Sequence, residues 1–114
     1  MRQRGHRYRG VRAGPVGIVS VDGEPLPPTA LAARLVPDSY DWGTPSTGAL
    51  ALAHALLTYE CDKRTADAAY AAFQREVIAA LPRGAGGEAW SLTSAEIRTW
   101  LEAHHRTRES GEQP

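Results

Sequence analysis

The stretch YDWGTPSTGALALAHALLTYE, residues 40–60, decides the fold of this chain. It opens with an aromatic turn at residues 40–43 and continues into residues 49–57, which contain only one polar side chain. Ser46 or Thr47 can cap a helix that runs to about residue 59 or 60. A helix that is apolar on nearly all sides belongs in the middle of a domain, so we expect the rest of the chain to pack around it.

Around this centre the chain has the size and composition of one small domain. Its 114 residues are 42% hydrophobic, which is enough to form a core. The formal net charge of +0 argues against a protein dominated by binding to a polyanion, although residues 1–21 hold five arginines and no acids. The single cysteine, Cys61, excludes an intramolecular disulfide and a multi-cysteine zinc site.

The sequence carries no signal for a membrane or for export. No apolar run approaches the roughly 20 residues that span a bilayer. The basic N-terminus lacks the apolar segment of a signal peptide. We therefore expect a cytoplasmic protein without a membrane partner.

The residues before the central stretch predict strands. Residues 7–12 and 16–21 are short runs separated by turn-forming residues 13–15, and the second run ends in a strong reverse-turn signal, Asp-Gly. Prolines at positions 25, 27 and 28 then interrupt regular pairing. Residues 29–36 fit either a helical turn or a short strand.

The residues after the central stretch predict two further helices. The first spans about residues 65–81, where apolar side chains recur at helical spacing, and Pro82 ends it. The second begins at a capping box formed by Thr93 and Glu96 and ends near Arg106.

These elements together define the expected fold class. Residues 1–106 are predicted to form a single α+β domain, in which a small N-terminal antiparallel sheet of two or three strands packs on three α-helices. Residues 107–114 are predicted to form a disordered C-terminal tail.

Four sequence features carry a resemblance to a known family. The most specific is the aromatic-x-Trp-Gly turn at residues 40–43, which runs into Gly48 and the Leu-Ala-Leu-Ala helix. The others are Tyr8-x-Gly10-x-Arg12, then Asp22-Gly23-x-Pro25-Leu26, and finally Phe73-x-x-Glu76-Val77-Ile78 through Leu81-Pro82 with Trp90-x-Leu92-Thr93 and Ile97. The chain therefore resembles domain of unknown function 6166, an uncharacterised family of bacterial, plasmid and phage proteins.

The resemblance implies an order of elements and no established activity. Members of the family usually have a more glycine-rich turn after the Trp-Gly pair, whereas residues 44–47 of this chain read Thr-Pro-Ser-Thr. This departure weakens the expectation that a ligand held by that turn in the family would also bind to this protein.

The spacing of Gly43 and Gly48 matches that of a phosphate-binding loop at the start of a helix. A true loop of that kind continues with lysine and a hydroxyl residue, and here Ala and Leu follow, so we exclude a nucleoside triphosphatase. A weaker anion site formed by Ser46, Thr47 and Gly48 is the functional interpretation, since helix N-termini present free N–H groups. Ordinary helix capping is the structural one.

Two groups of side chains in the N-terminal half are candidate partner-binding residues. Tyr40 and Trp42 would face one side of an extended turn, as a platform for a ligand or as a plug that locks the turn onto the helices. Arg7, Arg9 and Arg12 could form a nucleic-acid contact, or a solvated strand face paired with nearby acids.

The remaining reactive side chains have simpler interpretations. His54 on the apolar helix is expected to be a hydrogen-bonded core or edge residue. Cys61 just past that helix lacks the environment of a nucleophile. Glu60 and Asp62 are expected to carry charge on the surface. No metal, cofactor or catalytic set is expected.

The favoured function is a non-enzymatic binding module of unknown specificity, an accessory protein that acts on a macromolecular partner. A protein partner or self-association ranks first. The alternative is a nucleic-acid-binding protein that uses the arginine-rich N-terminal strand region. The second alternative is an enzyme or small-ligand binder that uses the turn from Trp42 to Gly48, which needs a pocket there lined by His54 and an acid.

Overall fold

The computed structural model describes residues 5–35, 40–82 and 89–111, and the predicted tail lies partly outside these ranges. Within them the chain forms a four-stranded sheet, four α-helices and one short 3-10 helix. The elements follow in the order β1 (Arg7–Ala13), β2 (Val16–Val21), β3 (Glu24–Pro25), α1 (Ala30–Leu35), α2 (Thr47–Glu60), α3 (Lys63–Glu76), η1 (Ile78–Ala80), β4 (Trp90–Thr93) and α4 (Ser94–Gly111).

The sheet is antiparallel, with strand order β3-β2-β1-β4. The predicted hairpin is present, and β1 pairs with β2 in a register that places Val11 opposite Ile18. The prediction of two or three strands misses β4, which returns from the C-terminal half to pair with β1 and places Tyr8 opposite Leu92. Four residues are too short a run to show a period, and the partner strand lies far away in the sequence, so no local pattern indicates this strand.

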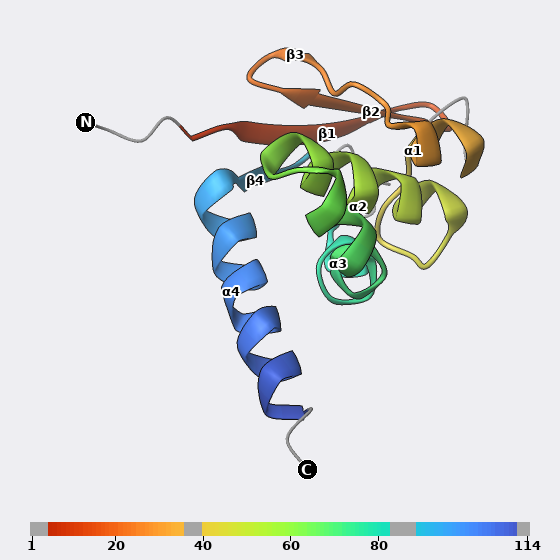
Figure 1. Cartoon of the computed structure of the whole chain (residues 1–114). Coiled ribbons are helices and arrows are strands. Elements are labelled where there is room, and N and C mark those ends of the chain that lie inside the picture. The colour runs from red at the N-terminus through yellow and green to blue at the C-terminus, as the bar shows by residue number, and fades with distance from the viewer. Residues whose placement is uncertain (1–4, 36–39, 83–88, 112–114) are drawn as a thin grey trace.

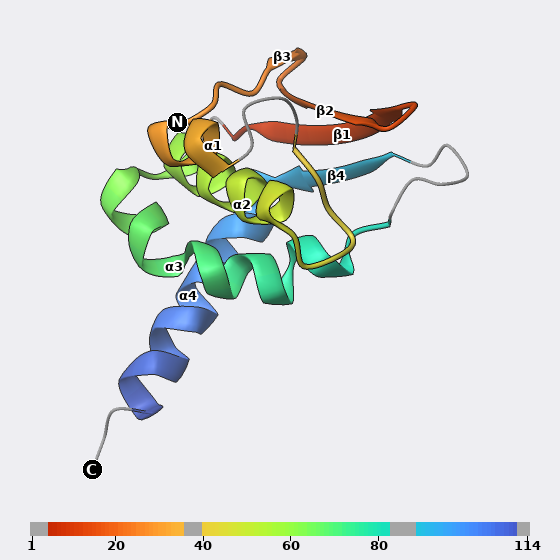
Figure 2. The same ribbon diagram turned by 90° about the vertical axis from the view of Figure 1, so that its right-hand side faces the viewer.

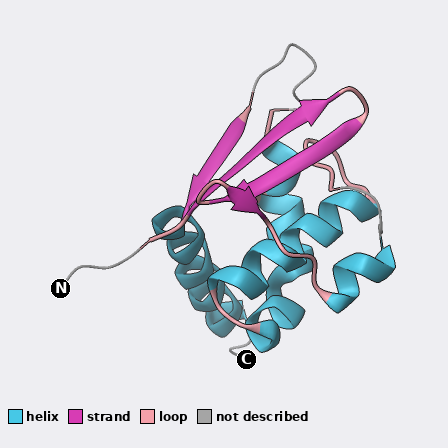
Figure 3. Cartoon of the chain, turned by 90° about the horizontal axis from the view of Figure 1, so that it is seen from above, coloured by secondary structure: helices cyan, strands magenta, loops and turns pink. Residues whose placement is uncertain are grey.

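The helices lie on one side of the sheet, so the α+β class is confirmed and the domain has two layers (Figures 1 and 2). Seen from above, the strands cross over the helical layer (Figure 3). The helix predicted at the centre is α2, which begins after its N-cap Ser46 and buries most of its residues. Its long apolar run explains this position, because a helix without a polar side must be covered all round.

Two glycines on the inner face of the sheet lack side chains and so leave room for the rings of two tryptophans. A side chain at Gly17 would lie 2.7 Å from Cζ3 of Trp42, and one at Gly10 would overlap the ring of Trp90. Both indole rings are buried, and they meet edge to face with centroids 5.6 Å apart. The predicted plug at Trp42 is therefore part of the core, between sheet and helices.

The structure settles one segment that the sequence left open and shifts the ends of two predicted helices. Residues 30–35, left open between helix and strand, form the short helix α1. The helix predicted over residues 65–81 begins earlier, after its N-cap Asp62, and ends at Glu76, followed by η1. Helix α4 has the predicted capping box and continues to Gly111 rather than ending near Arg106, so residues 107–111 of the predicted tail are helical.

Glu60 corrects the prediction that this acid lies on the surface, because its side chain is only 2% exposed. It accepts hydrogen bonds from the hydroxyl groups of Tyr8 and Ser94, at 2.7 and 2.6 Å. The Nε atom of Arg98 donates to its other oxygen at 2.6 Å. Burial acts to raise the pKa of Glu60, but these hydrogen bonds outweigh it and the pKa is lowered. The buried carboxylate thus joins β1, α2 and α4.

Candidate functional site

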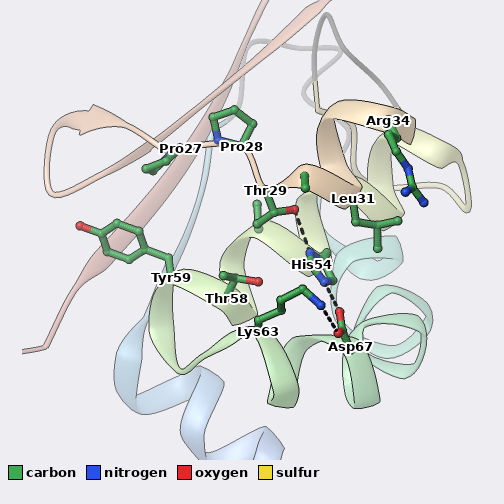
Figure 4. A pocket seen from close by; sticks show the side chains of 12 residues that line it. Pro27, Pro28, Thr29, Leu31, Arg34, His54, Thr58, Tyr59, Lys63 and Asp67 are labelled. Carbon is green, nitrogen blue, oxygen red and sulfur yellow. Dashed lines mark hydrogen bonds and ion pairs between the residues drawn. The ribbon is translucent and has the colours of Figure 1, made fainter.

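A cavity of about 550 Å³ lies between α1, α2, the start of α3 and the proline segment that precedes α1 (Figure 4). We call it the His54 pocket. Its lining residues are Pro27, Pro28, Thr29, Ala30, Leu31, Arg34, His54, Ala55, Thr58, Tyr59, Lys63 and Asp67. The size is typical of small-ligand sites, which measure roughly 300–1,000 Å³ and combine apolar walls with a few converging polar groups.

The polar floor of the pocket is a chain of three side chains centred on His54, whose ring is 2% exposed. The Nδ1 atom lies 2.8 Å from Oγ1 of Thr29, and the Nε2 atom lies 2.7 Å from Oδ1 of Asp67 (Figure 4). Because an ionised carboxylate only accepts hydrogen bonds, Nε2 carries the proton. In the neutral ring Nδ1 then accepts the hydroxyl hydrogen of Thr29.

Each end of this chain is held by a further contact. Oγ1 of Thr29 accepts the backbone N–H of Ala32 at 3.0 Å, which is a helix cap for α1. Oδ2 of Asp67 accepts a hydrogen bond from Nζ of Lys63 at 2.7 Å, one helical turn away. The hydrogen bonds from Lys63 and from His54 lower the pKa of Asp67, so this carboxyl group is ionised at neutral pH. The pocket is therefore pre-organised from α1 through α2 to α3.

One buried polar atom of a pocket-lining residue has no partner among the described residues. Oγ1 of Thr58 is buried, and it forms no hydrogen bond with the described residues. In the view of Figure 4 this side chain of α2 lies between those of Tyr59 and His54. Since buried hydroxyl groups are almost always paired, this hydroxyl group is the buried group beside the cavity that still has a hydrogen bond to form.

The predicted residues of the Trp42–Gly48 turn lie elsewhere, so the turn is not part of the His54 pocket. A second, smaller hollow brings together three residues of the turn, Ser46, Thr47 and Gly48, with the predicted partner-binding residues Arg12 and Tyr40. Trp42 has no exposed surface. Burial raises the pKa of Tyr40 to about 12. The turn is largely filled by side chains of the chain itself.

The start of α2, where an anion site was expected, already has a carboxylate. Asp41 accepts hydrogen bonds from Nη2 of Arg12, from the Trp42 N–H and from the hydroxyl group of Ser46. Burial acts to raise the pKa of Asp41, but the hydrogen bonds from Arg12 and Trp42 outweigh it and the pKa is lowered. A second anion here would meet this charge, so the geometry favours the capping interpretation of Ser46.

The three predicted arginines of β1 lie on two faces. Arg7 and Arg9 are exposed on the outer face of the sheet, as the alternation of the strand predicts. Arg12 turns inward, where its guanidinium lies 4.5 Å from the ring centroid of Trp42. It therefore belongs to the turn rather than to a surface patch.

The pocket uses one residue that the sequence identified and four that it did not. His54 was predicted as a hydrogen-bonded core residue, and its two hydrogen bonds confirm this. Thr29, Thr58, Lys63 and Asp67 were missed. The spacing of Lys63 and Asp67 predicts an i,i+4 ion pair. Nothing in the neighbouring sequence indicates that His54 forms a hydrogen bond with Asp67.

Two further properties concern the part of the chain that the structure describes. No group of three or more metal-binding side chains is close enough there to hold an ion. No helix in the same ranges combines the length and the apolar character needed to cross a membrane.

Comparison with known proteins gives one match. A family model described as a family of unknown function (DUF6166) matches residues 8–103. This range includes all four features of the resemblance seen in the sequence. No curated protein and no solved structure matches the chain.

Proposed function

Because the chain belongs to the family of unknown function DUF6166, which brings no activity with it, we propose a function from its geometry: the protein is a non-enzymatic binding module that recognises its ligand in the His54 pocket. The observation that carries this proposal is the pre-organised cavity itself. Apolar side chains form its walls, the His54 chain forms its floor, and the Thr58 hydroxyl is left for a ligand.

A binding role fits the His54 chain better than catalysis does. The order hydroxyl, imidazole, carboxylate resembles a nucleophilic triad. However, the Thr29 hydroxyl already caps α1, and the Asp67 carboxylate is 48% exposed and shared with Lys63. Both ring nitrogens of His54 are engaged in holding three helices together. These hydrogen bonds hold the walls of the pocket in place.

A neutral apolar probe tests the proposal without assuming a ligand class. Toluene titrated into ¹⁵N-labelled protein should shift the amide signals of Leu31, Ala55 and Tyr59, because small aromatic molecules enter apolar cavities. Ala30→Trp places a bulky ring at the pocket and should abolish these shifts. Ala33→Trp is the matched control, since Ala33 is exposed on the same helix and does not line the pocket. Unperturbed amides in the wild-type protein would contradict the proposal.

The outer face of the sheet supports nucleic-acid binding as a second candidate. Arg7 and Arg9 are both exposed there, and none of the helices in the described part of the chain covers this face (Figure 1). A salt-sensitive gel shift with DNA or RNA that Arg7→Gln/Arg9→Gln weakens would support it. Arg64→Gln/Arg75→Gln, which removes the same charge from the exposed surface of α3, is the control. No shift near physiological ionic strength would exclude this candidate.

The same face also supports the protein partner or self-association that the sequence favoured. Ile18 is 49% exposed and Val16 is 43% exposed, next to each other on one face of β2. Concentration-dependent sedimentation that Ile18→Ser abolishes would support self-association. A monomer at all concentrations would leave a different protein as the partner of this face.

A further inference from the structure

The His54 pocket has side-chain donors without partners among the described residues, whereas the acceptors of its His54 chain already have partners. Both oxygens of Asp67 already accept hydrogen bonds, one from His54 and one from Lys63. The Thr29 oxygen accepts from a backbone N–H, and Nδ1 of His54 faces the Thr29 hydroxyl. A ligand that brings donors would have to share these acceptors with the bonds that they already accept.

The donors, in contrast, are largely unused. Arg34 forms no hydrogen bond or ion pair with the residues that the structure describes. Lys63 has three donors and uses one of them for Asp67. The hydroxyl group of Thr58 is unpaired. The pocket therefore complements a ligand rich in acceptors.

The charges around the pocket lead to the same conclusion. Asp67 neutralises Lys63, which leaves Arg34 without a counter-ion among the described residues. Figure 4 shows Arg34 and Lys63 on different sides of the pocket, on α1 and α3 respectively. A single negative charge on the ligand is thus matched by the Arg34 guanidinium, whose planar group binds carboxylates in a bidentate way.

The walls determine the rest of the ligand. Pro27, Pro28, Leu31 and Ala55 contribute apolar surface to the pocket that Arg34 and Thr58 also line. A ring or a short aliphatic chain of the ligand would pack against this surface, and the burial of apolar area would favour binding. The unpaired Thr58 hydroxyl marks a second point where an oxygen atom of the ligand bonds.

We propose that the His54 pocket binds small organic acids that carry one carboxylate on an apolar body, with a hydroxyl or carbonyl oxygen at the opposite end. The carboxylate pairs with Arg34, the body lies between the two prolines and Leu31, and the second oxygen bonds to Thr58. The inference rests on the proposed function, since it names the ligand class of the same pocket.

Three matched compounds test this ligand class by calorimetric or NMR titration. They are para-hydroxyphenylpropionate, its uncharged amide, and phenylpropionate, which lacks the hydroxyl group. The acid should bind wild-type protein about three- to tenfold more tightly than the amide, as a partly exposed charge-assisted pair does. The hydroxylated acid should bind about threefold or more tightly than phenylpropionate, since a neutral hydrogen bond contributes roughly 1 kcal/mol.

Two variants assign each preference to its residue. In Arg34→Gln the acid and the amide should bind equally, whereas Arg75→Gln, an exposed arginine away from the pocket, should keep the preference for the acid. In Thr58→Val, which keeps the shape of the side chain, the hydroxylated and plain acids should bind equally. The comparison of acid with amide in wild-type protein stands even if a variant does not fold.

The outcomes separate this inference from the proposed function. If the amide binds wild-type protein as tightly as the acid, or if only toluene binds, the ligand class is wrong and the pocket is still a binding site. If neither toluene nor the acid binds, both proposals fail. If the preference for the acid survives Arg34→Gln, the carboxylate is not held as proposed.

Discussion

Trp42 and Trp90 meet edge to face with their ring centroids 5.6 Å apart and their planes at 79°. One ring comes from the turn before α2 and the other from β4, so this contact joins the two halves of the chain. Each ring lies against a glycine of the sheet, Gly17 and Gly10 respectively. The pair forms only because both glycines leave room for an indole ring on the inner face.

Gly17→Ala should destabilise the fold. The added Cβ atom would lie 2.5 Å from the backbone oxygen of Tyr40 and 2.7 Å from Cζ3 of Trp42, so the turn must shift. We expect a loss of about 1–3 kcal/mol in the free energy of unfolding, measured by urea denaturation. Gly5→Ala is the control, because its new Cβ meets nothing closer than 3.6 Å. Equal stability of the two variants would refute the claim that Trp42 needs the space that Gly17 leaves.

Glu60→Gln should lower stability and change its dependence on pH. The lowered pKa of Glu60 means that the unfolded state binds the proton more tightly, so its contribution is present above the ordinary value of 4.5 and is lost on acidification below it. We expect a loss of about 1–3 kcal/mol at neutral pH, measured by urea denaturation.

The difference between wild type and Glu60→Gln should then be smaller at about pH 3 than at neutral pH, because the contribution of Glu60 is lost as the pH falls below 4.5. Glu102→Gln, an exposed acid on α4, is the control and should change little at either pH. A difference in stability that is the same at both pH values would contradict this role of Glu60.

Thr29→Val should loosen α1 and the floor of the His54 pocket together. The variant removes the helix cap and leaves Nδ1 of His54 without its partner, so about 1–2 kcal/mol of stability should be lost. At about pH 8 the ¹⁵N signals of the wild-type His54 ring should show the proton on Nε2. Thr47→Ala, an exposed position in the first turn of α2, should change neither quantity. A proton found on Nδ1 would overturn the assigned tautomer.

Arg12→Gln and Arg9→Gln should separate the inward arginine from the outward one. Arg12 bonds to the half-buried Asp41 carboxylate and covers the Trp42 ring, and its loss should cost about 1–3 kcal/mol. Arg9 is exposed, and its replacement should change stability by less than about 0.5 kcal/mol. Thermal denaturation of both variants measures the contrast, and equal melting temperatures would refute it.

Local patterns predicted the elements that depend on neighbouring residues. The alternation in β1 places Arg7 and Arg9 on one face, as found, although Arg12 was grouped with them and turns inward. The capping signals at Ser46 and at Thr93 predicted where α2 and α4 begin. These features depend on side chains a few residues apart, so a short window of sequence contains the whole interaction. The end of α4 had no such signal and was predicted too early.

The pocket could not be predicted in the same way. Thr29, which caps α1, His54 on α2 and Asp67 on α3 are polar residues from three different segments, and each has an ordinary local role. Glu60 looked like a surface acid because the sequence does not show that Tyr8, Ser94 and Arg98 converge on it. Such contacts depend on how the helices pack.

The sequence by itself determined that residues 40–60 form a turn and a buried central helix, because an apolar run with a polar cap has few other stable conformations. The tertiary structure alone decided that β4 completes the sheet, that a carboxylate lies buried at Glu60, and that a cavity opens beside His54. Hydrogen bonds between distant segments gain their energy only after the chain has closed the loops between them, so no local pattern encodes them.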